Sequence, residues 1–171
     1  MLIGTHALLP VCGCLLADNL AVAVGRERMF PVRSLWVVGI FGILPDLCSP
    51  HISLEARYSS WSHTVWFMAG LVLVAAMTGT FQEKGSRMLV AVACWFASAV
   101  HLAADAVSGG IAWLYPWRED VVGRYFIPPE HWMWFDAGFV LLAWFLIRSV
   151  LHWEARGIRR AGLSPILPDD T

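Results

Sequence analysis

The stretch AVHLAADAVSGG, residues 99–110, carries the main evidence for both the fold and the function of this chain. It continues an apolar run that begins at Met88, and it ends in two glycines, which is typical of a membrane helix that stops near Gly109. His101 and Asp105 are four residues apart, so their side chains share one face of this helix. An ionisable residue inside a span costs about 2.5–3.5 kcal/mol on insertion scales, so the pair indicates a function or a partner.

The whole chain has the composition of an integral membrane protein. Of its 171 residues, 58% are hydrophobic and 15% are charged, and the mean hydropathy is +0.61. The net charge of −1 gives no basic surface for nucleic acid. We therefore expect one transmembrane helical domain over residues 1–151, a cytoplasmic C-terminal tail over residues 152–171, and membrane lipid or lipid-linked partners.

Five apolar stretches predict an all-α fold, a polytopic membrane helix bundle of four to five hydrophobic segments. Polar connectors with Gly and Pro separate them, and the stretches cover residues 2–24, 35–47, 64–81, 88–106 and 132–151. The second is short for a span, so we expect it to be tilted, half-inserted or packed inside the bundle. The first lacks the basic region of a signal peptide, so we expect it to be retained as a helix.

The basic residues predict the orientation of these segments. If all five cross the membrane, nine of the twelve Lys and Arg residues lie on one side, and Arg57, Arg118 and Arg124 lie on the other. The positive-inside rule places the nine in the cytoplasm. The N-terminus and the connectors that hold the other three arginines are then outside.

This orientation predicts that several potential metal ligands meet at the outer face. They lie at or near the outer ends of four segments: His6, Asp46, His63, His101 and Asp105. Imidazole nitrogen and carboxylate oxygen suit Zn²⁺ best and, with more oxygen ligands, Mn²⁺ or Fe²⁺. We therefore predict a divalent metal, with zinc the first choice.

Each of these residues also has an ordinary structural explanation. A single His at a helix end is often an interfacial residue, and an Asp after Pro45 is commonly a cap or turn residue. The pair His101 and Asp105 would also fit a hydrogen bond that clamps two helices. Asp18, expected at the inner side, and Asp136, without an evident partner, are not assigned to the site.

The same residues carry a resemblance to a known family. Their motifs occur in the same order over residues 4–128: GTHALLP with His6, LPDLCSP with Asp46, WSHT with His63, and HLAADAVSGGIAWLYPW with His101 and Asp105. This set resembles the bacterial membrane-bound metal-dependent hydrolases of the inner membrane, and more distantly it is similar to zinc-dependent phospholipases C. The resemblance implies a multi-pass inner-membrane hydrolase in which these five residues bind metal. Two departures are Cys48, where the family has a second Asp, and Tyr58-Ser59, where it has His-Arg. The resemblance makes Cys48 either a further ligand, as a thiolate, or an inert thiol.

These features together favour metal-assisted hydrolysis of a phosphoester in a lipid or lipid-linked substrate. A metal-activated water would be the nucleophile, with Asp46 or Asp105 taking its proton or orienting a ligand. Arg57, Arg118 and Arg124 are candidates to bind phosphate oxygens, although snorkelling at the interface would also explain them. Two alternatives stay open: a proton or metal-ion transporter, and a structural protein whose helices are clamped by a metal with no open coordination position.

Overall fold

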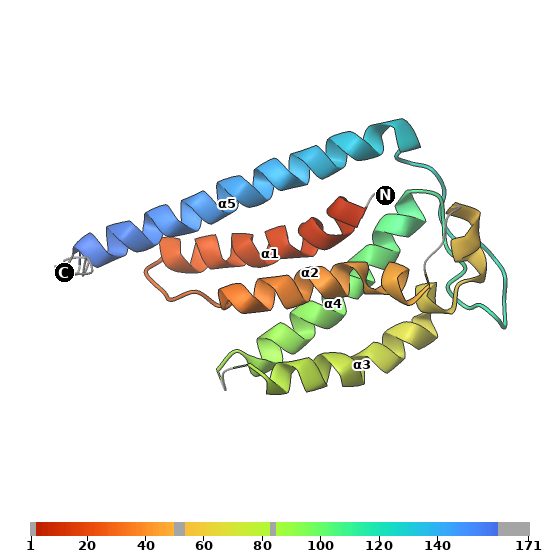
Figure 1. The fold of residues 1–171 in the computed structure, drawn as a ribbon, viewed down its shortest axis with the longest axis horizontal. Helices are drawn as coiled ribbons and strands as arrows, with labels where there is room; N and C mark the ends of the chain where they lie inside the picture. Colours follow the sequence, from red (N-terminus) through yellow and green to blue (C-terminus); the bar gives the residue numbers. More distant parts are fainter. Residues whose placement is uncertain (1–2, 50–53, 83–84, 161–171) are drawn as a thin grey trace, which may run out of the picture.

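The computed structural model describes residues 3–49, 54–82 and 85–160, and in these ranges the chain is almost entirely helical (Figure 1). The α-helices are α1 (Ile3–Ala23), α2 (Val32–Cys48), α3 (Val65–Thr80), α4 (Arg87–Val107) and α5 (Trp132–Arg160). Short 3-10 helices lie in the connectors: η1 (Leu54–Ser59), η2 (Trp61–His63) and η3 (Pro129–His131). No β-strand forms within the ranges given, only two isolated bridges. The all-α prediction is confirmed there, and each apolar stretch coincides with a helix.

Among the described helices, three are long and apolar enough to cross a membrane: Ile3–Ala23, Arg87–Val107 and Pro129–Gly157. The other two are shorter, with 17 residues in α2 and 16 in α3. At 1.5 Å per residue these two measure about 25 Å, slightly less than the hydrocarbon thickness of about 30 Å. α5 continues past residue 151, so the predicted tail begins as helix, and residues 161–171 lie outside the described part.

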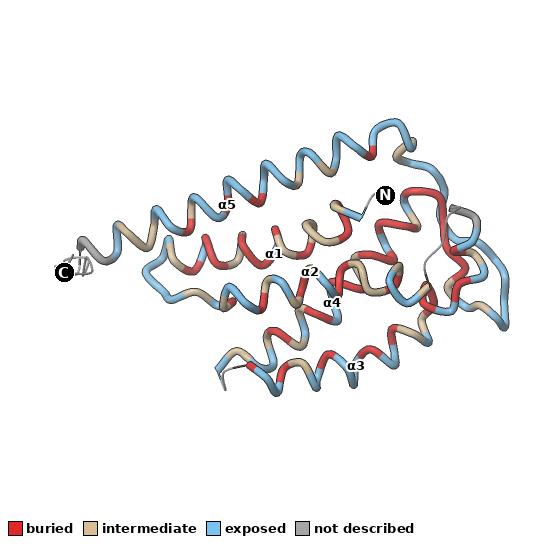
Figure 2. The backbone as a smooth tube through the Cα atoms, in the orientation of Figure 1, coloured by how far each residue is buried: buried red, intermediate tan, exposed pale blue. Residues whose placement is uncertain are grey.

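The helices pack in sequence from α5 through α1 and α2 to α4 and α3. α1 lies between α5 and α2, while α4 packs against α2 and α3 (Figure 1). Apolar side chains such as Val38, Cys94 and Leu102 fill the core between α2, α3 and α4. On α5, buried positions recur along the side that faces α1 and most others are exposed (Figure 2), which is typical of a lipid-facing helix.

The chain direction alternates so that four helix ends meet at one end of the bundle. The first turn of α1, the last turn of α2, the start of α3 and the last turn of α4 lie there. Gly42 lets α1 and α2 approach, because a Cβ at this position would lie 2.3 Å from the carbonyl oxygen of His6. The connector after α4 folds back and donates backbone hydrogen bonds to Ala106 and Val107, which satisfies carbonyls at the end of α4.

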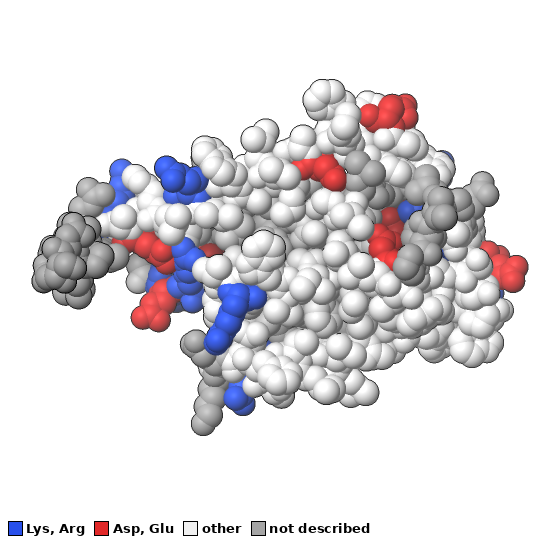
Figure 3. All heavy atoms as spheres, viewed as in Figure 1, with Lys and Arg blue, Asp and Glu red and all other residues white. Residues whose placement is uncertain are grey.

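Charged residues are distributed unevenly along the bundle. Lys and Arg gather at the end of the molecule where α5 terminates, whereas the middle of the visible face is uncharged (Figure 3). This end carries Arg26, Arg28, Arg33 and Arg156; Lys84 belongs to the same predicted group but lies outside the described residues. The basic residues are therefore concentrated opposite the meeting point of the four helix ends.

Candidate metal centre

Four described side chains at this meeting point form a group that could hold a metal ion: Asp46, His63, His101 and Asp105. One ligand atom from each lies within 4.8 Å of those of the others. α4 supplies His101 and Asp105, the last turn of α2 supplies Asp46, and η2 supplies His63. The two imidazoles and the Asp105 side chain are buried, whereas the Asp46 side chain is 21% exposed and forms the open side of the group.

Five of the six distances between the ligand atoms fit a tetrahedral metal site. The Nε2 atoms of His63 and His101 are 3.3 Å apart. Asp46 Oδ1 lies 3.3 Å and 3.5 Å from these two nitrogens, and Asp105 Oδ2 lies 3.3 Å and 3.4 Å from them. Ligands about 2.0–2.1 Å from a tetrahedral ion are separated by about 3.3–3.4 Å. All the pairs that include a histidine therefore have the spacing of a preformed site.

The outer nitrogens of both imidazoles are held by groups that fix the ring orientation. His101 Nδ1 lies 2.7 Å from the carbonyl oxygen of Gly42, which can only accept, so Nδ1 carries the hydrogen. His63 Nδ1 lies 3.2 Å from Ser62 Oγ, whose own hydrogen is donated to the carbonyl oxygen of Pro45 at 2.6 Å. Ser60 Oγ lies 3.1 Å from the same nitrogen, so two hydroxyls hold this edge of the His63 ring. In the neutral His101 ring Nε2 then offers its lone pair to the group, as in metal-binding histidines.

The two carboxylates make this position attractive to a cation. Burial disfavours the charged form of His63, but the hydrogen bonds to Asp105 and Asp46 and the charge of Asp105 outweigh it, so the pKa of His63 is raised above its ordinary value. The negative charge that favours a proton on this ring also favours a divalent ion between the ligand atoms.

His6 lies beside the group of four and contacts two of its members. Its Nε2 is 3.3 Å from Asp105 Oδ1, and its ring lies on that of His101 with the centroids 4.0 Å apart. The structure thus brings together all five residues predicted as ligands, four of them as one set of ligand atoms. Cys48 is exposed on α2 and does not belong to that set.

The three outer arginines occupy different environments. Arg57 is predicted to bind substrate phosphate from an outer connector, but its side chain is buried and its Nη1 lies 2.8 Å from Asp105 Oδ1. Arg118 is exposed and pairs with Asp120 at 2.9 Å. Arg124 lies over the ring of Phe126, 5.2 Å from its centroid. Of the three, Arg118 and Arg124 are on the surface, where a substrate phosphate could reach them.

The two acidic residues left unassigned by the sequence have structural roles. Asp136, expected to lack a partner, accepts hydrogen bonds from the backbone and hydroxyl of Thr5, which ties α5 to α1 one residue before His6. Asp18 accepts from the backbone amides of Met29 and Phe30 at the other end of the bundle. The only sequence signal for either contact is an acidic residue in an apolar segment.

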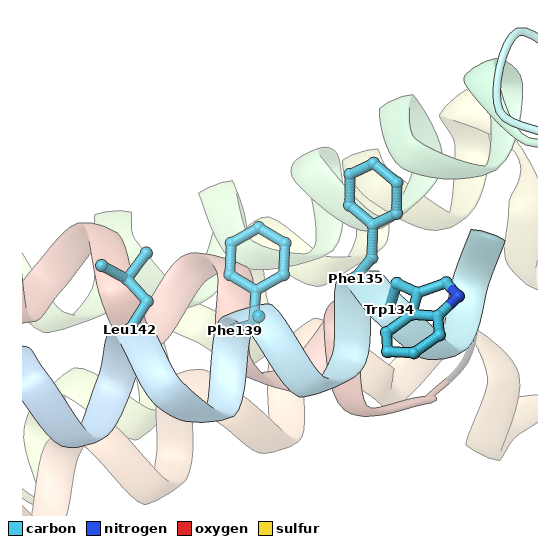
Figure 4. Close-up of a pocket in the computed structure, with 5 residues that line it drawn as sticks. Trp134, Phe135, Phe139 and Leu142 are labelled. Carbon is cyan, nitrogen blue, oxygen red and sulfur yellow. The ribbon is translucent and has the colours of Figure 1, made fainter.

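Two surface pockets differ in the residues that line them. An apolar pocket of about 410 Å³ lies along α5, where Phe135, Phe139 and Leu142 follow one another (Figure 4), and it contains no acid, base or ligand. A second pocket, of about 480 Å³, is lined by Trp61 and Thr64, which flank His63 in the chain, and by residues of the connector after α4.

Comparisons with known proteins identify the family. A family model described as YdjM inner membrane protein matches residues 1–166. No curated protein and no solved structure matches the chain. The match supports the expected bacterial inner-membrane protein, and the family description says nothing of hydrolysis or phospholipase C. Because it covers nearly the whole chain, this protein belongs to the YdjM inner membrane protein family.

Proposed function

We propose that the protein is a metal-dependent hydrolase that cleaves a phosphoester in a lipid or lipid-linked substrate. The observation that carries the proposal is that two imidazole nitrogens and two carboxylate oxygens meet at one end of a membrane bundle, with each nitrogen 3.3–3.5 Å from the other nitrogen and from both oxygens. This donor set suits Zn²⁺ best, with Mn²⁺ or Fe²⁺ as the alternatives. When bound, such an ion supplies Lewis acidity and a coordinated water with a pKa of about 7.

The exposure of each residue suggests its role. His63, His101 and Asp105 are buried and would hold the ion in place. Asp46 lies at the open side, where its carboxylate is placed to orient the attacking water or to accept its proton. Arg118 and Arg124 are exposed in the neighbouring connector and are placed to bind phosphate oxygens. Arg57 is directed at Asp105 and is not assigned to the substrate.

One observation favours a second candidate, a structural metal site. Four protein ligands fill all the coordination positions of a tetrahedral ion, and sites without an open position are usually structural. The partial exposure of Asp46 favours the enzyme, because a ligand at the open side is the one that can yield a position to water. A transporter has less support. It would need ionisable groups along the depth of the membrane, and the buried Asp18 is already bonded to backbone amides of the loop between α1 and α2.

The topology that this function requires can be tested by cysteine labelling. In a Cys48→Ser background, we expect Glu119→Cys in intact spheroplasts to react with a membrane-impermeant maleimide, and Arg26→Cys to react only after permeabilisation. Both positions are exposed, at opposite ends of the bundle, and the basic end belongs in the cytoplasm. The reverse pattern would place the metal centre on the cytoplasmic side, and labelling of both from outside would contradict a membrane between them.

The activity itself is tested with purified protein and a panel of phospholipids and lipid-linked phosphates. We expect release of phosphate or of a phosphorylated headgroup that chelation stops and added Zn²⁺ restores. Arg124→Ala should mainly raise KM, because an exposed arginine that anchors phosphate contributes to binding rather than to the nucleophile. Metal binding without turnover on any substrate of the panel would favour the structural site, and metal-dependent ion flux in proteoliposomes would favour the transporter.

A further inference from the structure

The two oxygens of Asp105 face different groups. Oδ2 lies with the ligand atoms, 3.3 Å from His63 Nε2 and 3.4 Å from His101 Nε2. Oδ1 faces the other way, 2.8 Å from Arg57 Nη1 and 3.3 Å from His6 Nε2. The carboxylate therefore separates a side suited to a metal ion from a side that already holds a cation.

The guanidinium of Arg57 is fixed in this position. Arg57 is 2% exposed, and its Nη2 donates to the carbonyl oxygen of Ser108 at 2.8 Å. A Cβ on Gly109 would lie 2.3 Å from the same nitrogen, and the φ of Gly109 is +139°, so this glycine leaves room for the guanidinium. Arginine stays charged at every physiological pH, so this is a permanent positive charge.

A second metal ion on Oδ1 would have to share this oxygen with the guanidinium. Carboxylate oxygens hold zinc at about 2.0–2.2 Å. An ion that close to Oδ1 would stand next to Nη1, with two cations on one buried oxygen and little solvent to screen them. His6 Nε2, when it carries its hydrogen, also donates to Oδ1 and is then not free to bind a metal.

We infer that Arg57 is a built-in cation that takes the place of a second metal ion, so that the cluster binds one divalent ion, on the Oδ2 side of Asp105. In this arrangement Arg57 is a positioning residue: it holds Asp105 and touches neither the ion nor the substrate. The inference rests on the metal centre of the proposed function, but not on hydrolysis.

The test measures metal stoichiometry and affinity of the full-length protein in detergent. The wild type, Arg57→Gln, Arg57→Lys and Arg118→Gln are stripped with a chelator, and Zn²⁺ is returned against a competing chelator dye. Arg118 is the matched control, an exposed arginine at the same end. We expect one Zn²⁺ per wild-type chain, a Kd about 10–100 times higher in Arg57→Gln, a smaller rise in Arg57→Lys, which keeps the charge, and no change in Arg118→Gln.

The possible outcomes separate this inference from the proposed function. Two ions per wild-type chain, or unchanged affinity in Arg57→Gln, would overturn the inference even if the protein hydrolyses phosphoesters. One ion with the expected Arg57 effect but no turnover would support the inference and count against the hydrolase. If Arg57→Gln fails to fold, the wild-type stoichiometry and the Arg57→Lys affinity still decide. A wild type that binds no ion would overturn both.

Discussion

Replacement of His101 by alanine is expected to abolish stoichiometric metal binding and any hydrolytic activity while leaving the helices formed. Structural zinc sites have apparent binding free energies of about 10–16 kcal/mol. Shared among four ligands, the loss of one is then worth about 3 kcal/mol, or more than a hundredfold in affinity. His101 is fully buried and held by the Gly42 carbonyl oxygen, which fixes the place of its Nε2 in the group.

The measurement is elemental analysis of the purified protein, with circular dichroism as the check on helix content. His131→Ala is the matched control, because His131 is exposed at the same end of the molecule in η3 and should keep the metal. A His101→Ala protein that retains one zinc per chain and full affinity would remove His101 from the centre. If His101→Ala loses helix content, the same measurement is made on His101→Gln, which keeps more of the side-chain volume.

Much of the fold could be predicted because a bilayer leaves few choices. Each apolar stretch must satisfy its backbone within itself, so it forms a helix, and Gly, Pro and polar connectors mark where it ends. Bilayer thickness does not determine where a helix ends beyond the membrane. For this reason α5 continues past residue 151 to Arg160, through a polar segment that the apolar pattern alone would not assign to it.

The ligands could be predicted because their chemistry and spacing are visible in the sequence. His101 and Asp105 share a helix face, and alternation of the helices brings Asp46, His63 and His6 to the same end. The connector that holds Arg57 has no helical periodicity from which the position of its side chains could be predicted. It is set by contacts distant in the chain, such as the hydrogen bond from Arg57 to Ser108. The burial of this arginine therefore could not be predicted from the residues next to it in the sequence.

Replacement of Asp105 by alanine should have a second large effect, on stability as well as on metal binding. The change removes one metal ligand and leaves the buried guanidinium of Arg57 without its carboxylate. Breaking a buried ion pair on one side costs about 3–5 kcal/mol, because the remaining charge is uncompensated. We expect a clear fall in the thermal unfolding midpoint in detergent, measured with chelator so that bound metal does not contribute.

The double variant Asp105→Ala/Arg57→Met separates the two roles of Asp105. Replacing both members of a buried pair by apolar groups is often neutral, so the double variant should regain much of the stability that Asp105→Ala loses. It should not regain the metal, because the Oδ2 ligand is still absent. A double variant no more stable than Asp105→Ala would mean that the guanidinium is not the source of the loss. If stability returns without the metal, Asp105 serves Arg57 through one oxygen and the metal through the other, which is the division that the geometry of its two oxygens requires.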